Sequence, residues 1–148
     1  MKTIMATCPE CSATWSDEGT CQEYFHQMLF WEAESPRLGE VHHLMVLSYY
    51  LQHPSLYSPD GLAEGRRLLV EFVERGATPA EVRRHNRGRL DSSQRKWKIK
   101  ATPDSHGAYP RPVKWTMTAA DVVAGGPEKY RDNVRGWAQT IHAALKAQ

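Results

Sequence analysis

The sequence lacks long apolar runs and has few cysteines, and each shortage excludes a class of protein. No stretch approaches the roughly 18 apolar residues of a membrane span, and the start, MKTIMATCPEC, lacks the apolar segment of a secretory signal. We therefore expect a cytoplasmic protein without membrane contact.

Three cysteines are an odd number, and without an export signal a disulfide framework explains them poorly. Metal binding or redox chemistry is the first interpretation.

Basic residues are scarce in the first part of the chain and abundant in the rest. Residues 1–60 contain two basic and eight acidic residues, whereas residues 61–148 contain seventeen basic and nine acidic ones. The net charges of these parts are therefore −6 and +8. Such asymmetry indicates either an anion-binding surface or two halves that attract one another across the fold, and we favour the second interpretation.

Length and composition are those of one small globular domain. A chain of 148 residues closes one hydrophobic core, and 41% hydrophobic with 24% charged residues is ordinary for a folded protein. We predict a mainly α fold, a single-domain helical bundle of about five to six helices with an appended two-stranded β-ribbon. The expected parts of this domain, residues 1–148, are an N-terminal knuckle (1–20), a helix hairpin (20–54), a basic helix and ribbon (78–118) and a C-terminal helix (127–146).

Prolines and capping residues divide the chain into predicted helices. The residue before a proline disfavours helix, so Pro36 and Pro54 end the first two helices. Thr78 with Glu81, and Thr118 with Asp121, have the spacing of capping boxes at helix starts. The predicted helices run over about residues 20–34, 38–53, 58–76, 78–93, 118–125 and 127–146.

Two short segments have the alternation of β-strands. In residues 95–101, Trp97 and Ile99 alternate with lysines, and residues 113–117 alternate in the same way. Because a lone two-stranded ribbon is marginally stable in water, its tryptophan face must pack on the helices. We expect the lysine face to point outward.

The cysteines have the spacing of a metal knuckle. Cys8-Pro9-Glu10-Cys11 places two thiols on a tight turn, where both can bind one tetrahedral ion. Cys21, at the start of the first predicted helix, supplies a third sulfur, and the helix dipole favours its thiolate there. These residues predict three of the four ligands of a zinc ion.

The fourth ligand is predicted from the packing of the first two helices. Two helices of similar length joined by a short loop form an antiparallel hairpin, which brings the end of the second beside the start of the first. His53 then lies near Cys21. His42 is about 16 Å away along the helix, too far for the same ion. His26 is the weaker substitute, because it lies about 140° around the helix from Cys21.

Other interpretations of the cysteines remain open. Three reduced cysteines without a metal are one, and a thioredoxin-like redox motif is another, although the βαβ context typical of that motif is missing. A catalytic zinc would keep one coordination position open, and four candidate ligands would fill it. We favour a structural Zn2+ site formed by Cys8, Cys11, Cys21 and His53.

These residues resemble those of a known family. The knuckle reads CPECS at residues 8–12, and residues 41–54 read VHHLMVLSYYLQHP. Both segments are similar to an uncharacterised bacterial domain-of-unknown-function family that begins with CPxCG, has a later cysteine and continues with a VHxLxVxxYxxQHP helix. The resemblance covers about the first 75 residues well and the final helices loosely, with Ser12 where glycine is usual. It implies no activity.

Three further candidates concern catalysis and partners. Glu32 and His42 meet at the other end of the predicted hairpin, and a carboxylate beside an imidazole is suited to general base catalysis in a hydrolase or transferase, or forms an ordinary hydrogen-bonded pair. His106 lies in a long loop, where functional residues are common. Residues 83–100, followed by Tyr109, Arg111, Lys114 and Trp115, suit polyanion or nucleic-acid binding, or form a solvated basic face. The basic residues of that segment are Arg83, Arg84, Arg87, Arg89, Arg95, Lys96, Lys98 and Lys100.

The leading hypothesis is a zinc-stabilised helical protein that acts by binding, with an unknown biochemical role. The metal would join the N-terminal knuckle to the first helix hairpin.

Overall fold

The structure is a computed structural model that describes residues 6–15, 20–85 and 98–148. The described part is mainly helical, which confirms the predicted fold class. Its elements are β1 (Ala6–Thr7), β2 (Thr14–Trp15), α1 (Cys21–Glu34), η1 (Pro36–Val41), α2 (His42–Leu51), η2 (Pro54–Leu56), α3 (Pro59–Val73), α4 (Pro79–His85), α6 (Ala119–Ala124), η3 (Pro127–Lys129) and α7 (Tyr130–Lys146), where η denotes a 3-10 helix.

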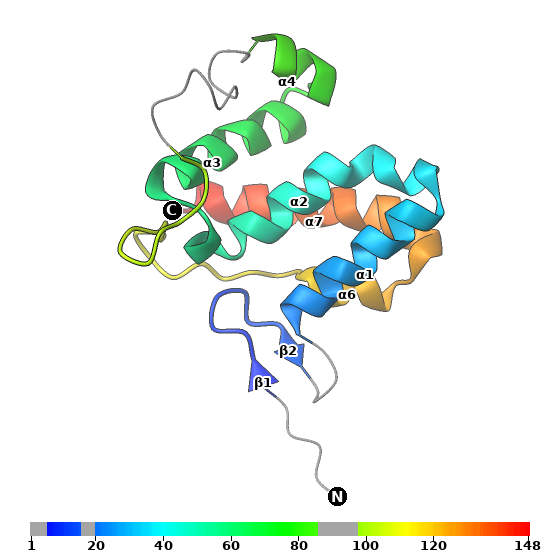
Figure 1. Cartoon of the computed structure of the whole chain (residues 1–148), viewed down its shortest axis with the longest axis horizontal. Helices are drawn as coiled ribbons and strands as arrows, with labels where there is room; N and C mark the ends of the chain where they lie inside the picture. The colour runs from blue at the N-terminus through cyan, green and yellow to red at the C-terminus, as the bar shows by residue number, and fades with distance from the viewer. Residues whose placement is uncertain (1–5, 16–19, 86–97) are drawn as a thin grey trace, which may run out of the picture.

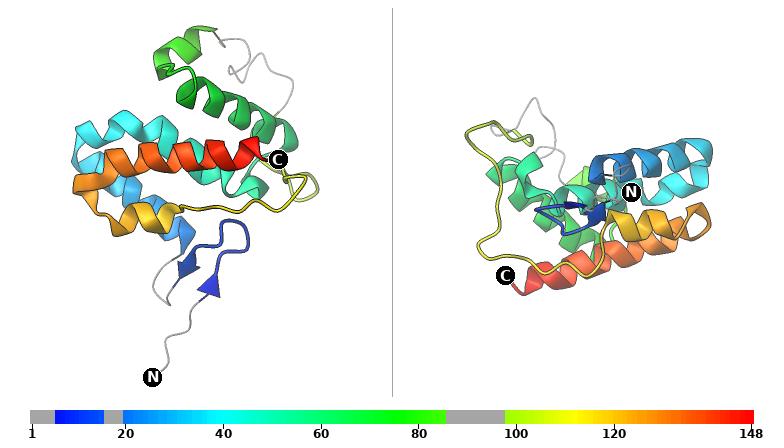
Figure 2. Two further views of the ribbon diagram at one scale, coloured as in Figure 1. Left: turned by 180° about the vertical axis from the view of Figure 1, so that it is seen from behind. Right: turned by 90° about the horizontal axis from the view of Figure 1, so that it is seen from below.

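Four helices form two stacked layers. Helices α1 and α2 make one layer and α6 and α7 the other, with α2 over α7 and α1 over α6 (Figure 1; Figure 2, right). Helix α3 packs across α2 and α7, and α4 extends beyond the end of α3. The hairpin of β1 and β2 lies at the opposite side, beneath the start of α1 (Figure 1).

The core follows the apolar stripes of α2 and α7. Helix α7 buries a single stripe of side chains, because a 3.6-residue period places them on one face. From α1 and α2 the core receives Met28, Met45 and Leu51, which are fully buried. The buried stripe of α7 is Tyr130, Val134, Trp137, Ile141 and Leu145.

The capping signals locate most helix starts correctly. The side chain of Thr20 accepts a hydrogen bond from the Glu23 N–H at the start of α1, and Thr118 with Asp121 forms a complete capping box before α6. The expected single helix over residues 38–53 is wrong, because η1 replaces its first turn and α2 begins only at His42. A segment with proline at its first position and a glycine inside favours the tighter 3-10 turns.

The predicted ribbon over residues 95–101 and 113–117 is wrong in its position. Residues 95–97 of the prediction lie outside the described residues; residues 98–101 do not pair with residues 113–117 but lie against residues 56–58, where Ile99 accepts a hydrogen bond from the Ser58 N–H at 2.8 Å. Gly61 permits this contact, since a Cβ there would lie 2.5 Å from the Ile99 carbonyl oxygen. The two-stranded ribbon of this fold is instead the pair β1 and β2, antiparallel around the knuckle, with Ala6 opposite Trp15 and Thr7 opposite Thr14.

No helix in the three described segments is long and apolar enough to cross a membrane.

Candidate metal centre

The knuckle is a tight turn between β1 and β2. The Cys8 N–H donates to the Ala13 carbonyl at 2.8 Å, and the Ser12 N–H donates to the Cys8 carbonyl at 2.9 Å, which closes the turn. The Cys11 N–H points at Cys8 Sγ at 3.5 Å. Ser12 has a φ of 68°, in the left-handed region that favours glycine. The turn therefore places both sulfurs on its inner side, at the cost of strain at Ser12.

Cys21 enters the same space from α1. It is the first residue of that helix, and the Thr20 cap immediately before it sets the direction in which the helix starts. Its side chain is buried, as are those of Cys8 and Cys11, and none of the three cysteines forms a disulfide. The positive end of the helix dipole adjoins this sulfur and favours its thiolate form.

His53 faces the cysteines because α2 ends just before it. Pro54 disfavours helical backbone at the preceding residue, and His53 has φ −129° and ψ 65°. Its Nδ1–H donates to the Tyr49 carbonyl at 2.6 Å, and the Tyr49 ring lies over the imidazole at a centroid distance of 4.3 Å. The other ring nitrogen, Nε2, is then left as the lone-pair donor that faces the sulfurs.

The four ligand atoms lie close enough together to surround one metal ion. Bonds of about 2.3 Å to sulfur and about 2.0 Å to nitrogen separate tetrahedral ligands by about 3.5 to 3.8 Å. Cys8 Sγ lies 3.6 Å from His53 Nε2, and Cys11 Sγ lies 3.4 Å from Cys21 Sγ. All four atoms lie within 4.8 Å of one another. The predicted ligand set is thus brought together and can hold a metal ion.

Burial and hydrogen bonds control the protons of this cluster. The hydrogen bond with Cys21, together with burial, raises the pKa of Cys11. Burial by itself would lower the pKa of His53, but hydrogen bonds to Cys21 and to the Tyr49 carbonyl outweigh it, so that the pKa is raised. Without a cation the cluster therefore retains protons, and a metal must displace them, which makes metal affinity dependent on pH.

Two contacts that the sequence did not predict hold the knuckle on the helical body. The Glu10 carboxylate accepts hydrogen bonds from the Ser55 N–H at 3.0 Å and from the Ser55 hydroxyl at 2.9 Å. The Trp115 indole N–H donates to the Glu10 carbonyl at 3.0 Å, across 105 positions of sequence. No periodicity or motif connects these residues, so only the folded chain reveals the contacts.

Glu32 and His42 meet as expected, at the other end of the α1–α2 hairpin. His42 Nδ1 lies 2.6 Å from Glu32 Oε1, and the Tyr130 hydroxyl donates to Glu32 Oε2 at 2.5 Å. The Glu32 side chain is 8% exposed and that of His42 is 52% exposed. One carboxylate thereby links α1, α2 and α7. None of the cavities described below has Glu32 or His42 in its lining, so general base catalysis by this pair stays a prediction.

Two other candidate histidines lie outside the cluster. His26 is exposed on α1 and does not belong to the four-residue group. His106 is exposed in the described chain before α6, and it borders a groove of about 350 Å3 next to the knuckle.

The basic segment can be described only in part. Arg83 and Arg84 are exposed on α4, and Lys98 and Lys100 are exposed at the start of the next described segment; the other predicted partner residues, Arg87, Arg89, Arg95 and Lys96, lie outside the described residues.

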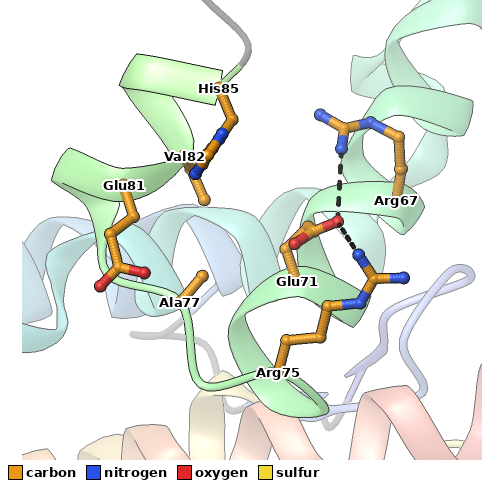
Figure 3. Close-up of a pocket in the computed structure, with 7 residues that line it drawn as sticks. All are labelled: Arg67, Glu71, Arg75, Ala77, Glu81, Val82 and His85. Atoms are coloured by element: carbon orange, nitrogen blue, oxygen red, sulfur yellow. Dashed lines mark hydrogen bonds and ion pairs between the residues drawn. The ribbon is translucent and has the colours of Figure 1, made fainter.

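A cavity of about 440 Å3 separates α3 from α4 (Figure 3). In it, Glu71 lies between two arginines, 3.0 Å from Arg75 and 3.8 Å from Arg67 (Figure 3). The charges of this cavity are therefore paired within it, which makes it a poor anion site.

Comparison with known proteins identifies the family of the chain. The model of a family of unknown function, DUF5946, matches residues 6–146. The chain belongs to this family. The match confirms the resemblance to an uncharacterised family and extends through α7 of this DUF5946 chain, beyond the first 75 residues that carried most of the resemblance. No curated protein and no solved structure gave a significant match.

Proposed function

We propose that Cys8, Cys11, Cys21 and His53 bind one Zn2+ ion, and that this ion stabilises a protein that acts by binding. The observation that supports the proposal is the convergence of four buried ligand atoms within 4.8 Å, contributed by the knuckle, the start of α1 and the end of α2, with Cys8 and His53 45 positions apart. Three cysteines that lie side by side without forming a disulfide also suit a reducing compartment such as the cytoplasm.

Zinc is the metal that this donor set favours. Three thiolates and one imidazole are soft to borderline ligands, and a tetrahedral arrangement of such ligands is typical of zinc. Carboxylate oxygens, which calcium and magnesium prefer, are missing from the four-residue group. The Nδ1–H of His53 is fixed by the Tyr49 carbonyl, which is the outer hydrogen bond that metal-binding histidines require.

A structural role is supported by the closed surroundings of the site. The four residues are between 0% and 5% exposed. Four protein ligands complete a tetrahedral shell, so no coordination position remains for substrate or water. The ion would join the short β1–β2 hairpin, which is too small to be stable alone, to α1 and to the end of α2.

Metal content is the decisive measurement. Untagged protein, purified without added metal, would be analysed by elemental mass spectrometry, together with the variants His53→Ala and Cys11→Ser. His26→Ala is the matched control, because it removes an exposed histidine from the α1–α2 hairpin, which also carries Cys21 and ends beside His53. We expect one equivalent of zinc in the wild type and in the control, and loss of zinc in both ligand variants. A folded wild type without metal would refute the proposal.

Cobalt substitution tests whether the coordination shell is closed. A tetrahedral shell rich in thiolates gives intense visible absorption with Co2+, and the band should persist unchanged when azide or imidazole is added. A spectrum that responds to these small ligands would show an open position and would contradict the structural role. So would unchanged thermal stability of the zinc-free Cys11→Ser protein.

A further inference from the structure

The groove of about 350 Å3 beside the knuckle is formed by residues that are distant in sequence. One wall is the knuckle itself, through Pro9 and Glu10, and the other is the extended chain before α6, through Tyr109, Arg111 and Trp115. This chain runs along the side of the helical layers from which the β-hairpin projects (Figure 2, left). The groove therefore lies outside the metal cluster, but two of its lining residues, Pro9 and Glu10, stand between the ligands Cys8 and Cys11.

The aromatic residues of the groove contribute ring carbons and not polar groups. The rings of Tyr109 and Trp115 meet edge to face, with centroids 5.9 Å apart. The Trp115 indole N–H is engaged by the Glu10 carbonyl, and the Tyr109 hydroxyl donates to the Leu51 carbonyl. With both polar groups bound internally, these half-buried rings can contact a ligand only through their π surfaces.

The charged groups around these rings favour an anion. Arg111 is held at the end of α7, where its Nη2 donates to the Ala147 carbonyl at 2.8 Å, and a guanidinium with five N–H donors retains others for a ligand. Two further cations adjoin the lining without belonging to it: the Arg66 guanidinium lies over the Tyr109 ring, 5.7 Å from its centre, and Lys114 is exposed next to Trp115 in the sequence. Among the lining residues described, Glu10 is the carboxylate, and Ser55 binds both of its oxygens.

We propose that this groove binds a nucleotide unit, with its base on the aromatic rings and its phosphate at Arg111. Stacking on aromatic faces combined with arginine contacts is the mode by which proteins bind single-stranded nucleic acid without reading its sequence. A free nucleotide presents the same chemistry. An acidic peptide fits less well, since an extended peptide needs main-chain hydrogen bonds and the groove's aromatic donors are already used.

The proposal moves the predicted polyanion surface from the basic segment to the groove. The basic residues of α4, Arg83 and Arg84, do not line the groove, whereas Tyr109 and Arg111 do. These two sets of residues can be separated by mutation. Arg111→Gln removes one groove charge, and Arg84→Gln removes the same charge from α4.

Binding would be measured by fluorescence anisotropy with labelled single-stranded oligothymidylate and oligouridylate over a series of salt concentrations. We expect binding at low salt that weakens as salt is added. Arg111→Gln should weaken binding about tenfold and reduce the slope of log K against log salt by about 0.7, the value for one phosphate contact to a single strand. Arg84→Gln should leave affinity and slope unchanged.

A pair of substitutions at Tyr109 tests stacking separately from charge. Tyr109→Phe keeps the ring and should retain affinity, whereas Tyr109→Leu removes it and should weaken binding about tenfold or more. Circular dichroism and zinc content are measured on every sample, so that loss of nucleotide binding is distinguished from loss of the metal. A variant that loses binding but retains its fold and its zinc shows an effect of the groove alone.

Competition identifies the source of the nucleotide. Displacement of the oligonucleotide by free uridine and adenosine monophosphates would assign free nucleotides, and displacement by unlabelled strands alone would assign nucleic acid. No binding at low salt, equal weakening by Arg84→Gln and Arg111→Gln, or equal displacement by oligoglutamate would overturn the proposal.

Discussion

The two ends of the α1–α2 hairpin use the same arrangement for different purposes. At each end a histidine of the α2 region is held by a hydrogen bond at Nδ1, so that Nε2 remains available. At one end His53 is bound by the Tyr49 carbonyl and faces three buried sulfurs. At the other end His42 is bound by Glu32 and is 52% exposed. The imidazole alone therefore does not define a metal site.

The surroundings determine what each histidine can do. Thiols that converge in a buried space beside an imidazole can hold a metal ion. Near His42 the partner is one carboxylate, which the Tyr130 hydroxyl also binds. That group is already satisfied by hydrogen bonds from two helices, so the interaction acts as a tertiary link.

The largest expected difference is in stability between substitutions at the two histidines. His53→Ala should lower the free energy of unfolding by more than about 3 kcal/mol, because it removes a metal ligand. His42→Ala should cost only about 1 kcal/mol, the net value of an ordinary hydrogen bond, because the His42 side chain is 52% exposed. Urea denaturation with and without a chelator measures both. The chelator should destabilise the His42 variant strongly and the His53 variant little, and equal costs would remove the distinction.

A smaller effect is expected in the knuckle turn. Ser12 has a φ of 68°, which glycine adopts without strain. Ser12→Gly should raise the free energy of unfolding by about 1 kcal/mol, the cost of left-handed backbone for a residue with a Cβ. Ser12→Ala is the control and should give no gain, because alanine has the same Cβ. If Ser12→Ala also raised the free energy of unfolding, the serine side chain and not the backbone conformation would be the cause of the effect.

The smallest effect concerns a second carboxylate–imidazole pair, Glu74 and His142. The Glu74 carboxylate is exposed, whereas the Glu32 carboxylate is buried. His142 Nε2 donates to Glu74 at 2.9 Å and Lys146 donates at 3.2 Å, and these hydrogen bonds lower the pKa of Glu74 from its ordinary 4.5. A lowered carboxyl pKa adds stability above the ordinary value, and this is lost as pH falls through the lowered one. As the pH is lowered from neutral to acid, the midpoint temperature of thermal unfolding should therefore fall slightly more steeply in the wild type than in Glu74→Gln. Parallel profiles would show that the pair contributes nothing.

The convergence of Cys21 and His53 was predictable from local signals. Thr20 caps α1 immediately before the cysteine, and Pro54 ends the helical backbone just after α2, directly beside the histidine. A hairpin of two helices with a short connection then has one possible arrangement at that end. Reasoning from helix boundaries succeeds here because the ligands lie at those boundaries.

The contacts of the chain between α4 and α6 were not predictable in this way. The alternation of residues 98–101 was interpreted as a strand of a separate ribbon, whereas the chain lies against α3, where Gly61 lacks the Cβ that would block Ile99. Trp115 was expected on a ribbon face, but its indole binds the knuckle. Both outcomes depend on long-range packing, which a period of two residues does not encode.

The contacts of Glu10 also bear on the order in which the protein folds during synthesis. The cluster is complete once residue 53 has emerged from the ribosome, whereas the Trp115 contact must wait for a segment 105 positions beyond Glu10. Contacts between distant residues carry a larger entropic cost of loop closure and form later. An ion bound early would hold the knuckle in place while α6 and α7 are still being synthesised. The Trp115 contact would then complete the groove against a knuckle that is already ordered.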